Sequence, residues 1–307
     1  MPLPTAVVIE EDILRDGLQN EERIFSADEK LAIVRDLEAA GVRRIQVGSF
    51  VHPKWVPQMA NTDEVFRALE RRPGVTYTGL ILNAKGLERA LACGVGHLSM
   101  SVSVSEQHSR RNVNRSVDEA LAEMVELIRH AVAAGIAVRA GAQCTFGCVY
   151  EGAIPKERVV RALDRMIEAG AQELNLSDTT GMANPVQVRE LVAETRARWP
   201  HVGVSLHLHD TRGLGLANMV AGCEAGATVF DTAAGGLGGC PFVKGAAGNV
   251  PTEDAVNMLQ AMGVETGIDV TVLCRAVERL ESLLERRLPG RMLRVLAPAR
   301  SPCAVSA

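Results

Sequence analysis

The feature that most constrains this fold is a regular alternation of short apolar runs with longer amphipathic stretches. Runs rich in β-branched or apolar residues predict strands at residues 6–11, 44–48, 77–82, 98–103, 137–144, 173–178, 202–210 and 228–233. Helical patterns separate them at residues 27–40, 62–71, 86–93, 117–134, 155–169, 185–199 and 214–225. Five helical stretches end at a residue that readily takes the left-handed C-cap conformation: Gly41, Gly94, Gly135, Gly170 and Gly226.

Eight such strand–helix units predict an α/β protein of the (β/α)8 TIM-barrel class. The alternative is an open doubly wound sheet, which usually has fewer strands and a glycine-rich turn after the first. Here Arg15-Asp16-Gly17-Leu18-Gln19 follows the first strand instead. Additional C-terminal helices are expected at residues 252–262 and 270–286, within the segment 252–290. We expect residues 1–307 to form one domain with a loose tail at 298–307.

Composition and charge restrict the kinds of partner that this chain is expected to bind. The net charge is −4 and aromatic residues make up 3% of the chain, so we expect no nucleic-acid partner. No apolar stretch approaches the roughly 20 residues that span a bilayer, so we expect no membrane span. The seven cysteines are scattered and odd in number, which argues against a disulfide framework. The opening residues lack the pattern of a secretory signal, and we therefore expect a cytoplasmic protein.

Two histidines stand at the end of the seventh predicted strand, in His207-Leu208-His209-Asp210. Because side chains alternate along a strand, both imidazoles are predicted on one side, at the carboxyl end. Two neutral imidazoles at this spacing suit a divalent metal ion. Taken alone, the pair fits equally well two hydrogen-bonded histidines of a half-buried strand.

Polar side chains also gather at the ends of the other predicted strands, where barrels of this class carry their active sites. They are Arg15, Asp16, Gln46, Ser49, Gln143, Asp178, Thr179, Cys240 and Asn249. Asp16, the two histidines and the amide of Asn249 supply mixed oxygen and nitrogen ligands, which predicts Mg²⁺ or Mn²⁺. Arg15 adds a planar fork of donors for a carboxylate or a developing enolate oxygen. Asp210 either orients an imidazole or caps a turn.

A glycine-rich loop at residues 235–249 holds Cys240 next to two glycines. A phosphate cradle is one interpretation, but the Walker spacing is absent. The glycines favour a mobile lid that brings the thiol over a substrate. The alternative is a cysteine buried as a small hydrophobic residue.

Several segments together resemble the 3-hydroxy-3-methylglutaryl-CoA lyase family, a branch of the metal-dependent lyases and synthases built on TIM barrels. The resemblance covers about residues 8–293. The Arg15-Asp16-Gly17 and His207-Leu208-His209 elements are shared across the wider group. Residues 49–59 (SFVHPKWVPQM) and 235–241 (GGLGGCP) are similar to the lyase branch in particular.

This resemblance implies a divalent-metal-dependent lyase that cleaves a 3-hydroxyacyl-CoA by retro-aldol (Claisen-type) chemistry to acetyl-CoA and a keto acid. It implies cation binding by Asp16, His207, His209 and Asn249. Arg15 would then stabilise the enolate of the departing acetyl-CoA, Cys240 would come from a lid, and His207 is also a candidate for proton transfer. The chemistry agrees, because this cleavage needs a base for the hydroxyl, a Lewis acid and a stabilised thioester enolate.

The partners expected from the resemblance are an acyl-CoA substrate and a second copy of the chain, most simply in a dimer. We expect further substrate contacts from residues at the strand ends: Gln19, Gln46, Ser49, Ser177 and Thr179.

Three segments depart from the family pattern. Typical members carry Glu where this chain has Gln46, Leu-Gly-Asp-Thr-Ile-Gly at residues 176–181 (here LSDTTG), and Cys-Pro-Tyr at residues 148–150 (here CVY). Gln46 removes a charge beside Arg15 and is expected to leave more positive charge free for a substrate carboxylate. The alternative function is therefore a citramalyl-CoA lyase that yields acetyl-CoA and pyruvate. A catalytically silent acyl-CoA-binding homologue is the alternative from another class.

Overall fold

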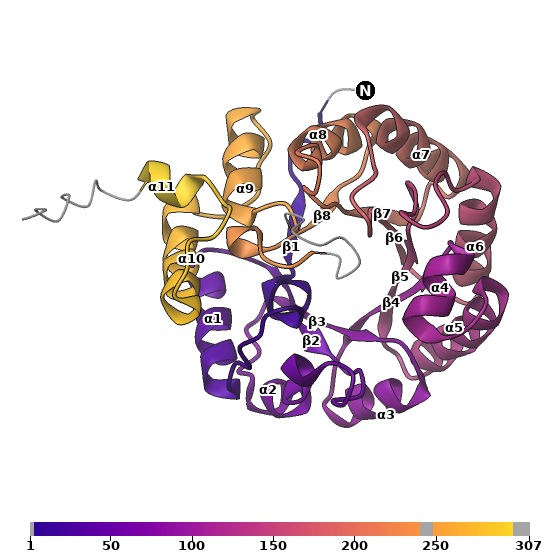
Figure 1. The fold of residues 1–307 in the computed structure, drawn as a ribbon, viewed down its shortest axis with the longest axis horizontal. Coiled ribbons are helices and arrows are strands. Elements are labelled where there is room, and N and C mark those ends of the chain that lie inside the picture. The colour runs from indigo at the N-terminus through magenta and orange to yellow at the C-terminus, as the bar shows by residue number, and fades with distance from the viewer. Residues whose placement is uncertain (1–2, 240–247, 297–307) are drawn as a thin grey trace, which may run out of the picture.

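Eight parallel strands close into a barrel in sequence order, and Figure 1 shows this ring inside a shell of helices. The strands are β1 (Val8–Glu11), β2 (Arg44–Ser49), β3 (Thr76–Ile81), β4 (His97–Ser103), β5 (Ala137–Gln143), β6 (Glu173–Ser177), β7 (Gly203–His207) and β8 (Val229–Thr232). Each strand pairs with the next, and β8 pairs with β1. This computed structural model describes residues 3–239 and 248–296. The predicted (β/α)8 barrel is confirmed.

Helices connect the strands on the outside of the barrel. They are α1 (Ala27–Ala39), α2 (Thr62–Ala68), α3 (Ala84–Ala92), α5 (Val117–Ala133), α6 (Lys156–Glu168), α7 (Pro185–Arg198) and α8 (Gly215–Ala225). The C-terminal helices α9 (Thr252–Ala261), α10 (Val270–Leu284) and α11 (Met292–Leu296) lie on the side of α1 (Figure 1). All five predicted C-cap glycines have positive φ, between 64° and 106°, because a left-handed residue is needed where each chain turns back. Every predicted strand and helix is present, with ends that differ by up to three residues.

Sequence patterns missed several short elements. Helix α4 (Glu106–Val113) escaped prediction because its residues are nearly all polar and give no apolar periodicity. A π-helix, η1 (Ile13–Gly17), follows β1, and 3-10 turns form η2 (Pro57–Met59) and η3 (Ala234–Gly236). The seventh strand ends at His207, three residues earlier than predicted. Beyond it the chain leaves β6 and pairs instead with the segment around Asn249.

Polar side chains fill the barrel interior in layers contributed by alternate strands, the usual arrangement in these barrels. One layer, from β1, β3, β5 and β7, holds Glu10, Thr78, Arg139 and Ser205. The next layer, from β2, β4, β6 and β8, holds Gln46, Ser99, Asn175 and Asp231. Hydrogen bonds join the two layers. The interior therefore depends on pairing of polar groups, whereas such barrels more often fill it with branched apolar residues.

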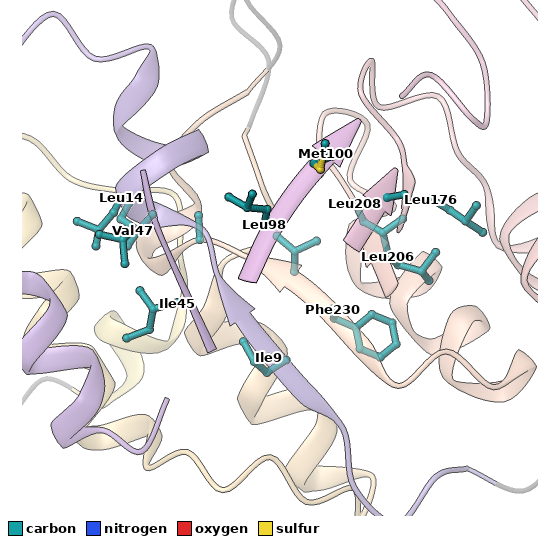
Figure 2. Close-up of a cluster of buried hydrophobic side chains, with 14 of the residues drawn as sticks. Ile9, Leu14, Ile45, Val47, Leu98, Met100, Leu176, Leu206, Leu208 and Phe230 are labelled. Atoms are coloured by element: carbon teal, nitrogen blue, oxygen red, sulfur yellow. The ribbon is translucent and has the colours of Figure 1, made fainter. Parts of the chain in front are cut away.

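The apolar residues of the strands alternate with these polar ones and face the helices. Figure 2 shows part of this layer, with Ile9, Ile45, Leu206 and Phe230 among the labelled side chains. Its packing is tight at α8, where a Cβ on Gly222 would come within 2.3 Å of Leu206 Cδ1. This apolar layer holds the strands in place, so that their carboxyl ends can carry functional groups.

Candidate metal centre and active site

The π-helix η1 places Arg15 and Asp16 at the mouth of the barrel. The backbone carbonyl of Asp12 accepts hydrogen bonds from the amides of Arg15, Asp16 and Gly17 at 2.9–3.2 Å. This wide turn follows directly after β1. Single π-turns of this kind occur preferentially at functional sites.

Asp16, His207 and His209 converge as predicted. His207 Nε2 lies 3.1 Å from His209 Nε2, and Asp16 Oδ2 lies 3.6 Å from His209 Nε2 and 4.0 Å from His207 Nε2. All three residues are buried. Two ligands that hold one cation at right angles with bonds of ~2.1 Å are separated by about 3.0 Å, and opposite ligands by about 4.2 Å. The three separations fall in that range, so the groups fit one divalent ion.

Asn249 completes this cluster. It lies opposite His209 in an antiparallel bridge, and its Nδ2 donates to Asp16 Oδ2 at 2.7 Å. Its Oδ1 is buried and has no hydrogen-bond partner among the described residues, and the same holds for His209 Nδ1. Gly238 makes this approach possible, since a Cβ there would lie 2.5 Å from Asn249 Nδ2. A buried oxygen without a partner is costly unless a ligand binds it, which agrees with a cation site.

Arg15 lies beside the cluster with its guanidinium bonded on three sides. Its Nη1 donates to Asp16, its Nη2 to Asp12 and its Nε to Gln46, each at 2.5 Å. Burial alone would lower the pKa of Arg15, but Asp12 and Asp16 outweigh it and raise the pKa. Burial would raise the pKa of Asp16, yet Arg15 and the two histidines hold that pKa far below its usual range. Asp16 is therefore ionised, the form that binds a cation.

His207 is held from behind by carboxylates that the sequence analysis did not identify. Its Nδ1 lies 3.3 Å from Asp231 Oδ2 and 3.6 Å from Asp12 Oδ2. Burial lowers the pKa of His207 despite the raising effect of Asp231, so its imidazole is neutral near pH 7. Asp231 in turn binds Arg139 at 2.5 Å. A carboxylate behind a ligating histidine fixes the ring orientation and the tautomer.

A sequence signal for Asp231 existed. It is a charged residue in the middle of the predicted strand at residues 228–233, and in the barrel it pairs in register with His207. Asp12 closes a run of three acids, Glu10-Glu11-Asp12, at the end of a buried strand. Consecutive carboxylates in such a strand are rare without partners, and both acids could have been flagged on that ground.

A cavity of about 210 Å³ opens over the cluster. Among the residues expected to contact substrate, Gln19, Gln46, Ser177 and Thr179 line it. The cavity also includes His108 and Asn112 from α4, the helix that the sequence patterns missed.

The expected substrate contact from Ser49 is wrong. Ser49 is fully buried and does not line the cavity, and its Oγ faces the carbonyl of Leu80. A register shift between Gln46 and Gly48 accompanies this change of facing along β2.

Gln46 lies within a network of hydrogen bonds that includes Arg15. Its Oε1 accepts from Arg15, and its Nε2 donates to Glu10 Oε1 and Ser99 Oγ, both at 3.2 Å. Asp12 also bonds the guanidinium, with its Oδ2 2.5 Å from Arg15 Nη2. Burial raises the pKa of Asp12 well above its usual value, and Arg15 opposes this effect. The preference between citramalyl-CoA and 3-hydroxy-3-methylglutaryl-CoA that was inferred from Gln46 stays a prediction.

Two aspartates near the cluster support turns. Asp210 accepts from the amide of Gly215, the first residue of α8, at 2.8 Å. Of its two predicted roles, orienting an imidazole and capping a turn, Asp210 therefore has the second. Asp178 Oδ1 accepts from the amides of Met182 and Ala183. Cys240, predicted as the lid thiol, lies outside the described residues.

Comparisons with known proteins agree with this arrangement. The HMGL-like family model matches residues 6–280. A hydroxymethylglutaryl-CoA lyase of Bacillus subtilis is 41% identical over 96% of this chain and 99% of the relative. A 3-hydroxy-3-isohexenylglutaryl-CoA/hydroxymethylglutaryl-CoA lyase of Pseudomonas aeruginosa is 39% identical, with the same coverage of 96% and 99%.

A solved structure gives the same result. It is an HMG-CoA lyase from Acinetobacter baumannii in complex with coenzyme A and 3-methylmalate. It superposes on this chain with a TM-score of 0.90 at 35% identity and covers 99% of this chain and 98% of its own. The match thus extends over nearly the whole of both chains, and the expected resemblance is confirmed. This protein belongs to the HMGL-like family.

Proposed function

We propose that this protein is a divalent-cation-dependent lyase that cleaves 3-hydroxy-3-methylglutaryl-CoA to acetyl-CoA and acetoacetate. The observation that carries the proposal is the convergence of Asp16, His207 and His209 on one point of a cavity, next to the guanidinium of Arg15. The relatives named as hydroxymethylglutaryl-CoA lyases support an acyl-CoA of this class as substrate. Assembly into a dimer stays a prediction.

Asp16, His207 and His209, together with Oδ1 of Asn249, are the residues that would hold the cation. Their mixture of oxygen and nitrogen ligands favours Mg²⁺ or Mn²⁺. When bound, such an ion supplies a Lewis acid for the oxygens of the substrate.

The reaction breaks the bond between carbons 2 and 3 of the acyl chain. The hydroxyl on carbon 3 loses its proton, and its oxygen becomes the ketone oxygen of acetoacetate. The electron pair of the broken bond forms the enolate of acetyl-CoA, which then takes up a proton at carbon 2. Arg15 uses three of its five N–H groups within the protein, which leaves two for the enolate oxygen.

His207 had two predicted roles, and the geometry favours that of ligand. Its Nε2 faces His209 and Asp16, while its Nδ1 faces Asp231. One nitrogen lone pair cannot hold a cation and accept a proton at the same time. His207→Ala should therefore weaken Mn²⁺ binding at least tenfold. Unchanged Mn²⁺ affinity with lost turnover would assign His207 to proton transfer instead.

Cys240 stays a proposal for a thiol that reaches the acyl group from the glycine-rich loop. Cys240→Ser should leave the melting temperature unchanged and lower turnover. Alkylation of the wild-type thiol should be slowed by substrate. Alkylation that is equally slow with and without substrate, in a variant of normal activity, would favour a buried, inert cysteine.

The function is tested by assaying acetyl-CoA release from 3-hydroxy-3-methylglutaryl-CoA, citramalyl-CoA and 3-hydroxy-3-isohexenylglutaryl-CoA. We expect one acetoacetate for each acetyl-CoA from the first substrate, loss of activity after chelation, and recovery with Mn²⁺ or Mg²⁺. Release of pyruvate from citramalyl-CoA at a higher kcat/KM would replace the proposed substrate. Acyl-CoA binding without any release would indicate the catalytically silent homologue.

The matched control pairs two histidines. His209→Ala removes a proposed ligand, whereas His201→Ala removes an exposed imidazole that does not line the cavity. Only the first variant should lose cation-dependent activity. Equal activity in both variants would remove His209 from the site.

A further inference from the structure

Asp12 is a carboxylate at the site that neither the cluster of Asp16, His207 and His209 nor the turn requires. It is fully buried, and its Oδ2 lies 2.5 Å from Arg15 Nη2 and 3.6 Å from His207 Nδ1. Its Oδ1 has no hydrogen-bond partner among the described residues. The π-turn uses only the backbone carbonyl of Asp12, and no side-chain bond caps that turn. The carboxylate is therefore not required by the local backbone.

The charges around Arg15 explain what this carboxylate does. Gln46 is neutral, and Asp16 is shared with the proposed cation. Asp12 is thus the one remaining acid bonded to the guanidinium. It is fully buried and is not among the residues that line the cavity. Any effect on the reaction must pass through Arg15 or through the ring of His207.

We propose that Asp12 is the positioning residue for Arg15, and that it replaces a carboxylate at position 46. The two positions bond neighbouring nitrogens of the same guanidinium, Asp12 at Nη2 and Gln46 at Nε. A carboxylate at either one fixes the plane of the fork and aims its free N–H groups at the enolate oxygen. The inference rests on the proposed lyase function and adds a residue that acts behind the reacting groups.

The experiment moves the carboxylate from position 12 to position 46, so that it bonds Nε of Arg15 in place of Nη2. Asp12→Val removes the acceptor at similar volume, Asp12→Asn keeps an acceptor, and each is combined with Gln46→Glu. We expect kcat to fall about 100-fold in Asp12→Val and about 10-fold in Asp12→Asn, with KM changed less than threefold. Gln46→Glu should raise kcat at least fivefold in either Asp12 variant but not in the wild type. The rescue should be partial, because the new carboxylate faces Glu10.

Two further measurements tell whether Asp12 acts through Arg15 or through His207. Mn²⁺ affinity should change less than threefold in Asp12→Val if the carboxylate acts through Arg15. A tenfold loss would show that it acts through His207 and would overturn the proposal. Asp118→Asn, at an exposed acid, is the control and should match the wild type.

Other results would also overturn the inference. They are a kcat in Asp12→Val within twofold of the wild type, or an effect of Gln46→Glu that is the same with and without Asp12. Should Asp12→Val fail to fold, Asp12→Asn decides by the same two criteria. Failure of the proposed function is distinguishable, because the wild type itself would then release no acetyl-CoA.

Discussion

Two buried clusters of charge lie next to each other in this barrel, and they differ in how completely they are paired. In the interior cluster, Arg139 binds Asp231 at 2.5 Å and Glu10 at 3.0 Å, and Arg44 binds Glu10 at 2.5 Å and Glu173 at 2.7 Å. Here every charge faces an opposite charge from another strand. Among the described residues, every charged side chain of the interior cluster thus has an oppositely charged neighbour.

The metal cluster is incomplete without a ligand. Two imidazole nitrogens face each other at 3.1 Å, and Asn249 Oδ1 and His209 Nδ1 have no partner among the described residues. Such groups cost stability when buried unless something binds them. The charge pairing of the interior cluster agrees with a structural role, and the facing imidazoles of the metal cluster agree with a binding role. Asp231 joins the two clusters, because it binds both Arg139 and His207.

The largest effect on stability is expected in the interior cluster. Arg139→Met leaves Asp231 and Glu10 without their shared cation, and breaking a buried pair in this way costs about 3–5 kcal/mol of unfolding free energy. Urea unfolding would measure it. Arg161→Met is the control, since Arg161 pairs with Asp118 at the surface and should cost less than about 1 kcal/mol. Equal costs in both variants would break the comparison.

A substitution in the metal cluster should instead lower activity strongly and stability little. Asp16→Asn removes a ligand charge, so kcat/KM is expected to fall about 10³-fold, or about 4 kcal/mol. The melting temperature without metal should fall by only a few degrees, because the bond from Arg15 to an ionised Asp16 is lost while its bonds to Asp12 and Gln46 remain. Mn²⁺ should raise the melting temperature of the wild type but not that of the variant. Loss of stability with retained Mn²⁺ binding would make Asp16 a structural residue.

Most of the fold could be predicted from the sequence, because one simple rule relates residue patterns to strands and helices and another places active sites at the strand ends. Strand and helix patterns, together with glycines such as Gly41 and Gly226, determine the order of the units. The rule that active sites lie at strand ends then brought Asp16 to His207. What it missed follows from packing across the barrel. The partners of Arg15 depend on the π-turn after β1, and no local pattern predicts that turn.

Position 46 is a second case in which a contact across the barrel could not be predicted from the local sequence. The substitution of Glu by Gln is visible in the sequence, and the expected result was a free charge on Arg15. The structure shows Asp12, 34 positions earlier, bonded to the same guanidinium. A compensating residue on another strand can be found only once the two strands are known to be neighbours, as β1 and β2 are here. Interpreting a single substitution therefore required the fold.

Arg15→Lys is expected to have an intermediate effect on the site. Lysine keeps the charge but lacks the planar fork that bonds Asp12, Asp16 and Gln46 together, so kcat should fall about 100-fold. The melting temperature should change by only a few degrees. Steady-state kinetics and thermal unfolding measure the two effects, with Arg67→Lys at an exposed position as control. Near-normal turnover in Arg15→Lys would show that enolate stabilisation does not depend on the fork.

The smallest effect on stability is expected at Glu253. This buried acid has no cation beside it among the described residues, in contrast to Glu10. Burial opposes ionisation of both carboxyls, but Arg139 and Arg44 hold the pKa of Glu10 below its usual value. Burial raises the pKa of Glu253 to about 8, and only the amide of Gly235 bonds its Oε2. Burial also raises the pKa of Glu11 to about 7.

The sign of the pH dependence follows from this difference. Between its ordinary pKa of 4.5 and about 8, Glu253 holds its proton in the folded chain and loses it in the unfolded chain. Stability is therefore lost as the pH rises through that interval. Glu253→Gln mimics the protonated form, so its stability relative to the wild type should increase as the pH rises from 5 to 9. Urea unfolding at both pH values tests this, with the exposed Glu278→Gln as control. A residual decline in the variant should remain from Glu11, and a wild type whose stability is flat from pH 5 to 9 would mean that Glu253 is ionised and paired like Glu10.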